Sequence, residues 1–173
     1  MLSFDLAPEQ QALVDNVARF TRERIIPQAA ELDRESTFPA AQGAYRTTFP
    51  TPDQFVQPRG VFLLVSEQPG DRERAFVGCG GIRRIEDSTA GLVRYEVKHL
   101  WLQPRVRGRG WGRALLAELE RRALGFGADE LVLDTNASLT AAGVLYSSAG
   151  YEACAPYNDN PNATNWYRKV LGD

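Results

Sequence analysis

The chain has 173 residues, of which 43% are hydrophobic and 24% charged, and its formal net charge at pH 7 is −2. These values are typical of a compact globular protein, and they exclude a low-complexity chain or a strongly basic nucleic-acid-binding chain. Two cysteines are too few for a disulfide framework, and a lone His99 predicts no metal site. Because the sequence also has no long apolar run and no excess of basic residues, we expect a cytoplasmic protein without a membrane or nucleic-acid partner.

The first part of the chain predicts a helix followed by a long connection. Residues 8–26 place Leu13 and Val17 on one helical face, and Pro27 ends or kinks the helix. Several prolines and weak periodicity predict an irregular connection from Thr37 to Gly60. The sequence therefore divides into a helical segment 1–40, a proline-containing connection 41–60 and a domain 61–173.

The second part predicts a mixed domain of strands and helices. Strand signals at 61–66, 75–84 and 92–102 are separated by turn residues, as in an antiparallel meander. They are followed by a helix from Trp111 that Gly125 or Gly127 stops, a buried strand at 131–134, a helix near 138–149, and a closing strand pair at 151–155 and 165–171. We therefore expect an α/β (α+β) fold with a mostly antiparallel sheet flanked by helices.

A glycine-rich loop lies between the third predicted strand and the helix that follows it. It reads Arg107-Gly108-Arg109-Gly110-Trp111-Gly112-Arg113. Glycines let the backbone approach a ligand closely, and the free N–H groups of a helix's first turn favour a pyrophosphate. The spacing excludes both a P-loop and a dinucleotide-binding fingerprint. The alternative is an arginine-rich helix start that is only solvated. Glycine destabilises a helix, and this alternative does not explain why three glycines alternate here.

A second motif consists of Leu133-Asp134-Thr135-Asn136, Ala142, Leu145-Tyr146 and Gly150-Tyr151. Together with the glycine loop it resembles the GNAT superfamily of acyl-CoA-dependent N-acetyltransferases over about residues 61–171. The resemblance implies direct transfer of acetyl from acetyl-CoA to a primary amine of a small molecule or peptide. The cofactor-binding residues that it implies are Leu100, Trp101 and Leu102 through their backbones, Arg107, Gly108, Arg109, Gly110, Trp111, Gly112, Arg113 and Asn136.

The resemblance also implies two catalytic residues. Glu96 lies in a stretch similar to the family's E-x-K strand motif and is the expected base, acting on the amine directly or through water. Tyr146 is the expected proton donor to the leaving thiolate. Strand alternation predicts that Glu96, Lys98 and Leu100 share one face of the strand and that His99 points to the other.

Each of these roles has an alternative that involves no chemistry. Glu96 fits a solvated strand glutamate paired with Lys98 or Arg94, and Tyr146 fits a packing residue. Asn136 fits the N-cap of a helix that starts near Leu139.

A further hypothesis, from the polar turn 157–162, is that Asp159 and Glu96 together attract a cationic amine.

Residues 1–39 resemble a different family. Phe4-Asp5-Leu6, Glu9-Gln10-Gln11 and Phe38-Pro39 are similar to the N-terminal helical segment of acyl-CoA dehydrogenases, but the chain is too short for such an enzyme. The segment either replaces the usual first strand and helices or is an appendage for packing or homodimer contacts. The competing functions are therefore a CoA-binding sensor or regulatory module without turnover, and a helical interaction protein.

Overall fold

The computed structural model describes residues 52–67 and 75–172, all of which belong to the compact unit Arg46–Asp173. The helix predicted over 8–26, the resemblance over 1–39 and the first part of the predicted connection lie outside the described residues. Within the described ranges, no helix has the length and apolar character needed to cross a membrane.

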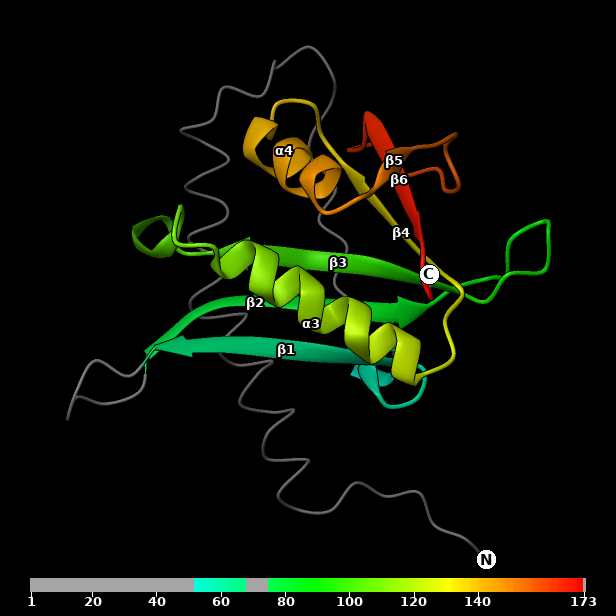
Figure 1. Cartoon of the computed structure of the whole chain (residues 1–173), viewed down its shortest axis with the longest axis horizontal. Coiled ribbons are helices and arrows are strands. Elements are labelled where there is room, and N and C mark those ends of the chain that lie inside the picture. The colour runs from blue at the N-terminus through cyan, green and yellow to red at the C-terminus, as the bar shows by residue number, and fades with distance from the viewer. Residues whose placement is uncertain (1–51, 68–74, 173) are drawn as a thin grey trace, which may run out of the picture. The chain divides into compact units, whose positions relative to one another are not determined.

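The described residues form a six-stranded sheet with the spatial order β1-β2-β3-β4-β6-β5 (Figure 1). Only β3 and β4 pair in parallel, and the other neighbours are antiparallel. The predicted mostly antiparallel sheet and its opening meander are therefore confirmed. The strands are β1 (Gly60–Glu67), β2 (Ala75–Arg84), β3 (Arg94–Leu102), β4 (Glu130–Thr135), β5 (Glu152–Ala153) and β6 (Asn165–Val170).

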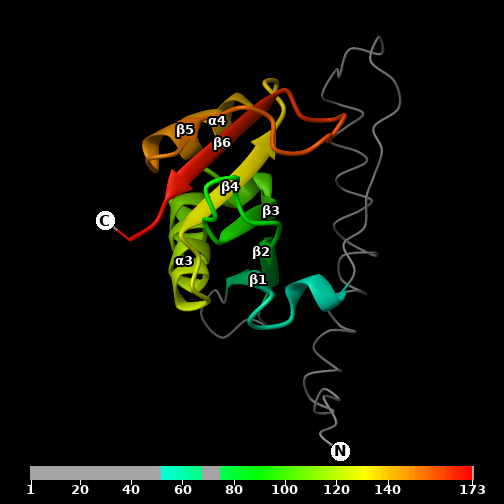
Figure 2. The ribbon, with the colours of Figure 1, turned by 90° about the vertical axis from the view of Figure 1, so that its right-hand side faces the viewer.

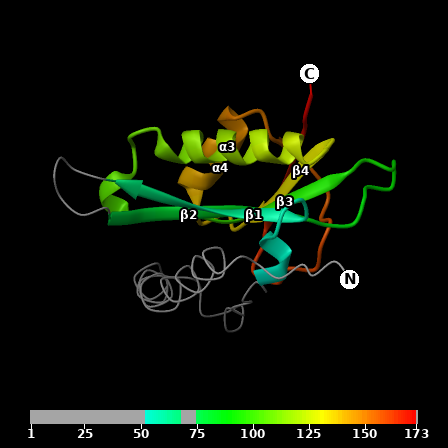
Figure 3. The same ribbon diagram turned by 90° about the horizontal axis from the view of Figure 1, so that it is seen from below.

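Two helices cover one face of the sheet, as Figure 3 shows from below. They are α3 (Trp111–Gly125) and α4 (Thr140–Ser148), close to the helices that the sequence predicts. Two short 3-10 helices complete the described elements: η3 (Pro52–Phe55), on the opposite face of the sheet, and η4 (Pro104–Val106), which leads from β3 into the glycine loop.

The core lies between α3 and the sheet. Leu116 and Leu119 of α3 are fully buried, and they join Leu131 and Leu133 of β4 in one apolar cluster. Gly80 of β2 allows this contact, because a Cβ atom there would lie 3.2 Å from Leu115 Cδ2 and 3.3 Å from Leu119 Cδ1. The helix thus packs closely on the strands that carry the candidate site.

A β-bulge on β3 corrects the predicted alternation. Cys79 pairs with Trp101 and Gly81 with Lys98, so two residues, His99 and Leu100, lie opposite Gly80 alone. His99 adopts a φ of 57°. Its ring therefore lies near Phe55 and Phe62, at centroid distances of 6.3 and 6.2 Å, whereas Leu100 packs against the core under α3. Glu96 and Lys98 share one face, as predicted. The prediction is wrong for the next two residues, because His99 and Leu100 lie on the faces opposite to those that simple alternation assigns.

The two parallel strands stop pairing early. Their register consists of Arg94 with Glu130, Tyr95 with Leu131 and Glu96 with Val132, although β3 continues to Leu102 and β4 to Thr135. Figures 1 and 2 show β4 inclined away from β3 beyond these pairs. The backbones of β3 and β4 therefore diverge over their second halves, a divergence that we call the opening, and the glycine loop follows β3 at its end.

Two glycine positions test this packing in opposite directions. At Gly78, opposite Leu102, a Cβ atom would lie 2.6 Å from the Trp101 carbonyl oxygen, so Gly78→Ala should lower the free energy of unfolding by about 1–3 kcal/mol. At Gly125, the last residue of α3, a Cβ atom meets nothing within 4 Å, so Gly125→Ala should raise it by up to about 1 kcal/mol. Urea unfolding measures both, and an equal effect of the two changes would contradict the packing described for β2.

Candidate active site

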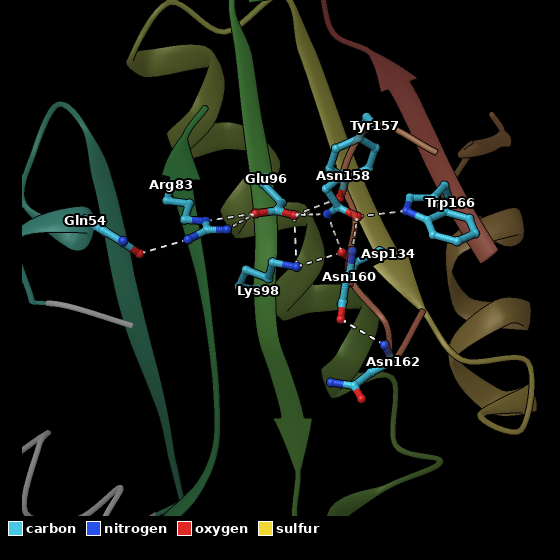
Figure 4. Close-up of polar contacts among 10 residues, drawn as sticks. All are labelled: Gln54, Arg83, Glu96, Lys98, Asp134, Tyr157, Asn158, Asn160, Asn162 and Trp166. Carbon is cyan, nitrogen blue, oxygen red and sulfur yellow. Dashed lines mark hydrogen bonds and ion pairs between the residues drawn. The ribbon is translucent and has the colours of Figure 1, made fainter. Parts of the chain in front are cut away.

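Glu96 lies on β3 at the last residue that pairs with β4, and its side chain is only 1% exposed. Its Oε2 accepts a hydrogen bond of 2.8 Å from Arg83 Nε and lies 2.7 Å from Arg83 Nη2 in an ion pair. Its Oε1 lies 2.9 Å from Lys98 Nζ and accepts from the Tyr157 hydroxyl at 2.9 Å and Asn158 Nδ2 at 3.1 Å. Figure 4 shows the carboxylate enclosed between Arg83 and the residues of the β5–β6 connection.

A second carboxylate, Asp134 of β4, completes the ionic group. Its Oδ2 accepts from Lys98 Nζ at 2.9 Å and from Asn158 Nδ2 at 2.6 Å, and its Oδ1 accepts from Asn160 Nδ2 at 3.2 Å. Burial opposes ionisation of Asp134, but Lys98 and the two asparagine amides outweigh it and hold its pKa below the usual value. Two cations thus face two carboxylates in a half-buried cluster.

Neighbouring residues hold this cluster in place. Gln54 of η3 accepts a hydrogen bond of 3.0 Å from Arg83 Nη1, and Trp166 Nε1 of β6 donates to Asn158 Oδ1 at 3.0 Å. The Arg94 guanidinium lies 5.6 Å from the centre of the Tyr157 ring. Burial, and then the charges of Glu96 and Asp134, raise the pKa of the Tyr157 phenol, so this hydroxyl donates to Glu96 as a neutral group.

The alternative expected for Glu96 is right in its pairing with Lys98 and wrong in its solvent exposure and in its pairing with Arg94. The side chain is buried rather than solvated, and its cationic partners are Lys98 and Arg83, which lies opposite it in the β2–β3 register. Arg94 instead lies 3.9 Å from Glu130. Asp159 is exposed, and Glu96 is already neutralised by two cations, so the described contacts give no support to joint attraction of an amine by this pair.

Tyr146 lies on α4 at the edge of the core, and the residue is 6% exposed. Its ring packs against Tyr151 and Tyr167, at centroid distances of 6.0 and 5.9 Å. Burial, followed by the negative charge of Asp134 and the neighbouring Tyr167, raises the pKa of Tyr146 to about 12. The phenol therefore keeps its proton at neutral pH, and the packing role expected as an alternative is also present.

The glycine loop has the backbone geometry of a close approach to a ligand. Gly108 and Gly110 have φ angles of 73° and 79°, and a Cβ atom at either would meet nothing within 4 Å. Gly110 is the N-cap residue of α3, no side chain caps the helix, and its first turn contains no acidic residue. The amides of this turn thus remain available to an anion.

The arginines of the loop have partners within the protein. Arg107 Nε donates to the Leu102 carbonyl at 2.9 Å, so one of the expected backbone acceptors is already in use. Arg113 donates to the carbonyl and hydroxyl oxygens of Ser148 at 3.1 and 2.6 Å, which ties α3 to the end of α4. Arg109 lies 3.5 Å from Glu67, so part of the positive charge expected here is balanced.

The remaining predicted residues surround the opening. Leu100, Trp101 and Leu102 lie on β3 beyond its last pair with β4, and the half-buried Trp101 has an indole nitrogen without a hydrogen-bond partner among the described residues. Asn136 follows β4 but caps no helix, because the N-cap position of α4 is Leu139. Its Oδ1 instead accepts from the Ser138 amide at 3.0 Å, and its Nδ2 donates to the Asn162 carbonyl at 3.0 Å.

Sequence reasoning missed most of the residues that enclose Glu96. A charged residue at the end of the apolar run Leu131 to Leu133 and the alternate asparagines of the β5–β6 connection are the signals that point to them. The missed residues are Gln54, Arg83, Asp134, Tyr157, Asn158, Asn160 and Trp166.

Within residues 52–67 and 75–172, no three histidine, cysteine, aspartate or glutamate side chains are grouped so as to hold a metal ion.

Comparison with known proteins agrees with this geometry. The model of the acetyltransferase (GNAT) family matches residues 13–151. The chain belongs to this family. An uncharacterised N-acetyltransferase from Schizosaccharomyces pombe is 30% identical over 104 residues, which are 60% of this chain and 59% of that protein. The chain thus spans about three fifths of the length of this GNAT relative.

A solved structure agrees in fold over most of the chain. It is a protein from Klebsiella pneumoniae assigned as an acyl-CoA N-acyltransferase, with 29% identity, a TM-score of 0.59, and coverage of 88% of this chain and 93% of that one.

The resemblance to acyl-CoA dehydrogenases is matched only in part. Benzylmalonyl-CoA dehydrogenase from Aromatoleum aromaticum is 55% identical over 40 residues, which are 23% of this chain and 11% of that enzyme.

The ionised Asp134 should make a measurable contribution to acid stability. A carboxyl group whose pKa is lowered by folding stabilises the fold above its unfolded pKa of about 3.9, and this contribution disappears as the pH falls through the lower, folded value. Asp134→Asn should therefore lower the free energy of unfolding by about 1–3 kcal/mol at pH 6, with a deficit that narrows below pH 4. Urea unfolding at several pH values measures this deficit.

Asp159→Asn is the control, because it removes an exposed carboxylate from the same β5–β6 connection. We expect it to leave both the free energy of unfolding and its pH dependence close to those of the parent. A deficit of Asp134→Asn that stays constant from pH 6 to pH 3 would contradict the ionic role assigned to Asp134.

Proposed function

We propose that this protein transfers the acetyl group of acetyl-CoA directly to an amine of a small molecule or peptide, in a ternary complex. The observation that carries the proposal is the opening between β3 and β4, which has an uncapped, glycine-led helix start at one end and the enclosed Glu96 beside it. Family membership supplies the reaction class. The free thiols of Cys79 and Cys154 accord with a cytoplasmic location, which we include in the proposal.

The cofactor would lie along this opening. The amides at the start of α3 and the open backbone at Gly108 and Gly110 fit the pyrophosphate of coenzyme A. The edge of β3 beyond Glu96 has no pairing with β4, and such an unpaired strand edge fits a pantetheine arm bound in the manner of an added strand. The thioester would then lie near the bulge at His99 and Leu100.

Glu96 would accept the proton that the amine loses as its nitrogen attacks the thioester carbonyl carbon. Five contacts already occupy the two carboxylate oxygens, and two of these contacts come from the neutral groups of Tyr157 and Asn158. Both residues belong to the β5–β6 connection. The substrate proton would thus reach Glu96 through the Tyr157 hydroxyl, or directly once this connection moves.

Tyr146 would supply a proton to the thiolate that leaves when the carbon–sulfur bond breaks. Its raised pKa, to about 12, keeps the phenol protonated at neutral pH, as this role requires. The proton taken by Glu96 and the proton given by Tyr146 balance over one turnover, and solvent returns both groups to their starting states.

A second candidate function has an observation in its favour. Glu96 is 1% exposed and fully engaged, as expected for a structural ionic network, and this favours a CoA-binding sensor or regulatory module without turnover. Both functions require acetyl-CoA binding, and they differ in whether Glu96 and Tyr146 carry chemistry.

Binding of acetyl-CoA at the glycine loop can be tested with a matched pair of variants. Gly110 and Gly91 have φ angles of 79° and 80°, and neither has an atom within 4 Å of an added Cβ. A valine is strained to a similar degree at both positions. Gly110→Val should weaken acetyl-CoA binding at least 10-fold in calorimetric titration, since it disturbs the pyrophosphate amides. Gly91→Val, in the β2–β3 connection, should bind like the parent, and equal weakening in both would place the site elsewhere.

Turnover distinguishes the enzyme from the binding module. With a panel of primary amines, we expect release of free thiol from acetyl-CoA that falls about 100-fold or more in Glu96→Gln and about 10-fold or more in Tyr146→Phe. Both variants should still bind acetyl-CoA. The control Tyr151→Phe keeps the ring that packs on Tyr146, removes only a buried hydroxyl beside Glu120, and should retain activity. Tight binding by the parent with no thiol release from any amine would favour the sensor.

A further inference from the structure

Asn158 lies where three strands of the site meet. Its Nδ2 donates to Glu96 Oε1 of β3 at 3.1 Å and to Asp134 Oδ2 of β4 at 2.6 Å. Its Oδ1 accepts from Trp166 Nε1 of β6 at 3.0 Å and from the Asn160 backbone amide at 3.3 Å. One side chain from the β5–β6 connection thus links all three strands, as Figure 4 shows.

This junction is located where the backbone no longer holds β3 and β4 together. The last pair is Glu96 with Val132, and the Lys98–Asp134 ion pair of 2.9 Å lies two residues further along each strand. Side chains, rather than a ladder of backbone hydrogen bonds, therefore set the width of the opening at its closed end. Among the described residues, Asn158 and Lys98 each contact both Glu96 and Asp134.

The chemistry of the amide suits this position. A primary amide nitrogen carries two hydrogens, and each has its own carboxylate acceptor here. The indole N–H of Trp166 and the backbone N–H of Asn160 are donors only, so their contacts with Oδ1 fix which end of the amide faces the carboxylates. An aspartate in place of Asn158 would have nearly the same shape, but when ionised it would place a third negative charge against Glu96 and Asp134.

We propose that Asn158 is a positioning residue for the candidate base: it orients the carboxylate of Glu96 and couples the β5–β6 connection to the width of the opening between β3 and β4. The inference rests on the function proposed above. Acetyl-CoA would bind at the glycine loop independently of Asn158, whereas the rate of acetyl transfer would depend on it.

The variant Asn158→Asp tests this role through pH. At pH 8 the added carboxylate cannot donate, and we expect kcat to fall about 10- to 100-fold while KM for acetyl-CoA stays within about 2-fold of the parent. At lower pH the added carboxyl group becomes protonated and donates again, so the ratio of variant to parent kcat should rise toward pH 6. A loss of kcat that is the same at every pH, or a loss carried by KM for acetyl-CoA, would overturn the proposal.

Two further variants complete the test. Asn165→Asp is the matched control: it adds the same charge to β6, one residue from Trp166 and on the opposite face of the strand, and it should keep the parent's kcat and pH profile. Trp166→Phe keeps an aromatic ring but removes the shorter of the two hydrogen bonds to Asn158 Oδ1, and it should lower kcat several-fold with KM for acetyl-CoA unchanged. If Asn158→Asp does not fold, an unchanged kcat in Trp166→Phe overturns the proposal.

Hydrogen–deuterium exchange gives a readout that does not depend on turnover. If Asn158 links the strands, Asn158→Asp should speed amide exchange in residues 97–102 and 156–163 together, relative to Asn165→Asp. Equal exchange in the two variants would overturn the link. A parent that releases no thiol would instead contradict the proposed function, and the exchange experiment would still decide whether the junction exists.

Discussion

The site depends on one constraint, which is that an ionised carboxylate buried in a sheet must be compensated. Removing a charge from water is costly unless opposite charges and hydrogen-bond donors replace the solvent. Glu96, at 1% exposure, meets this requirement with Arg83 and Lys98. Lys98 in turn faces Asp134, so the four side chains carry no net charge. The polar β5–β6 connection follows from the same need, since Tyr157 and Asn158 supply the remaining donors.

A second constraint concerns the backbone. β3 must leave β4 to form an opening, yet it must stay paired with β2 to remain in the sheet. The bulge at His99 allows both, because one extra residue on β3 changes the direction of the strand and moves Leu100 under α3. The glycine loop then turns the chain into α3. The positive φ angles at Gly108 and Gly110 let this turn occur without side chains over the start of the helix.

The sequence predicted what depends on local pattern. Strand and helix ranges follow from periodicity and turn residues, and the motifs around Gly110 and Tyr146 led to the family that the comparisons show. It could not predict the bulge, since nothing in the residues around His99 departs from ordinary alternation. It also could not identify Arg83 as the partner of Glu96, because that contact depends on the register between two strands. The asparagines of the β5–β6 connection read as turn formers, and only the fold brings them to the carboxylates.

The thiol of Cys79 has a consequence for the order of chemical events. Cys79 pairs with Trp101 beside the bulge, is 2% exposed, and donates weakly from Sγ to the His99 carbonyl at 3.4 Å. Burial raises its pKa to about 12, so almost no nucleophilic thiolate exists at neutral pH. An acyl-enzyme on this sulfur is therefore disfavoured, although it lies in the strand next to the opening. This accords with the proposed direct transfer, in which acetyl-CoA and the amine are bound at the same time.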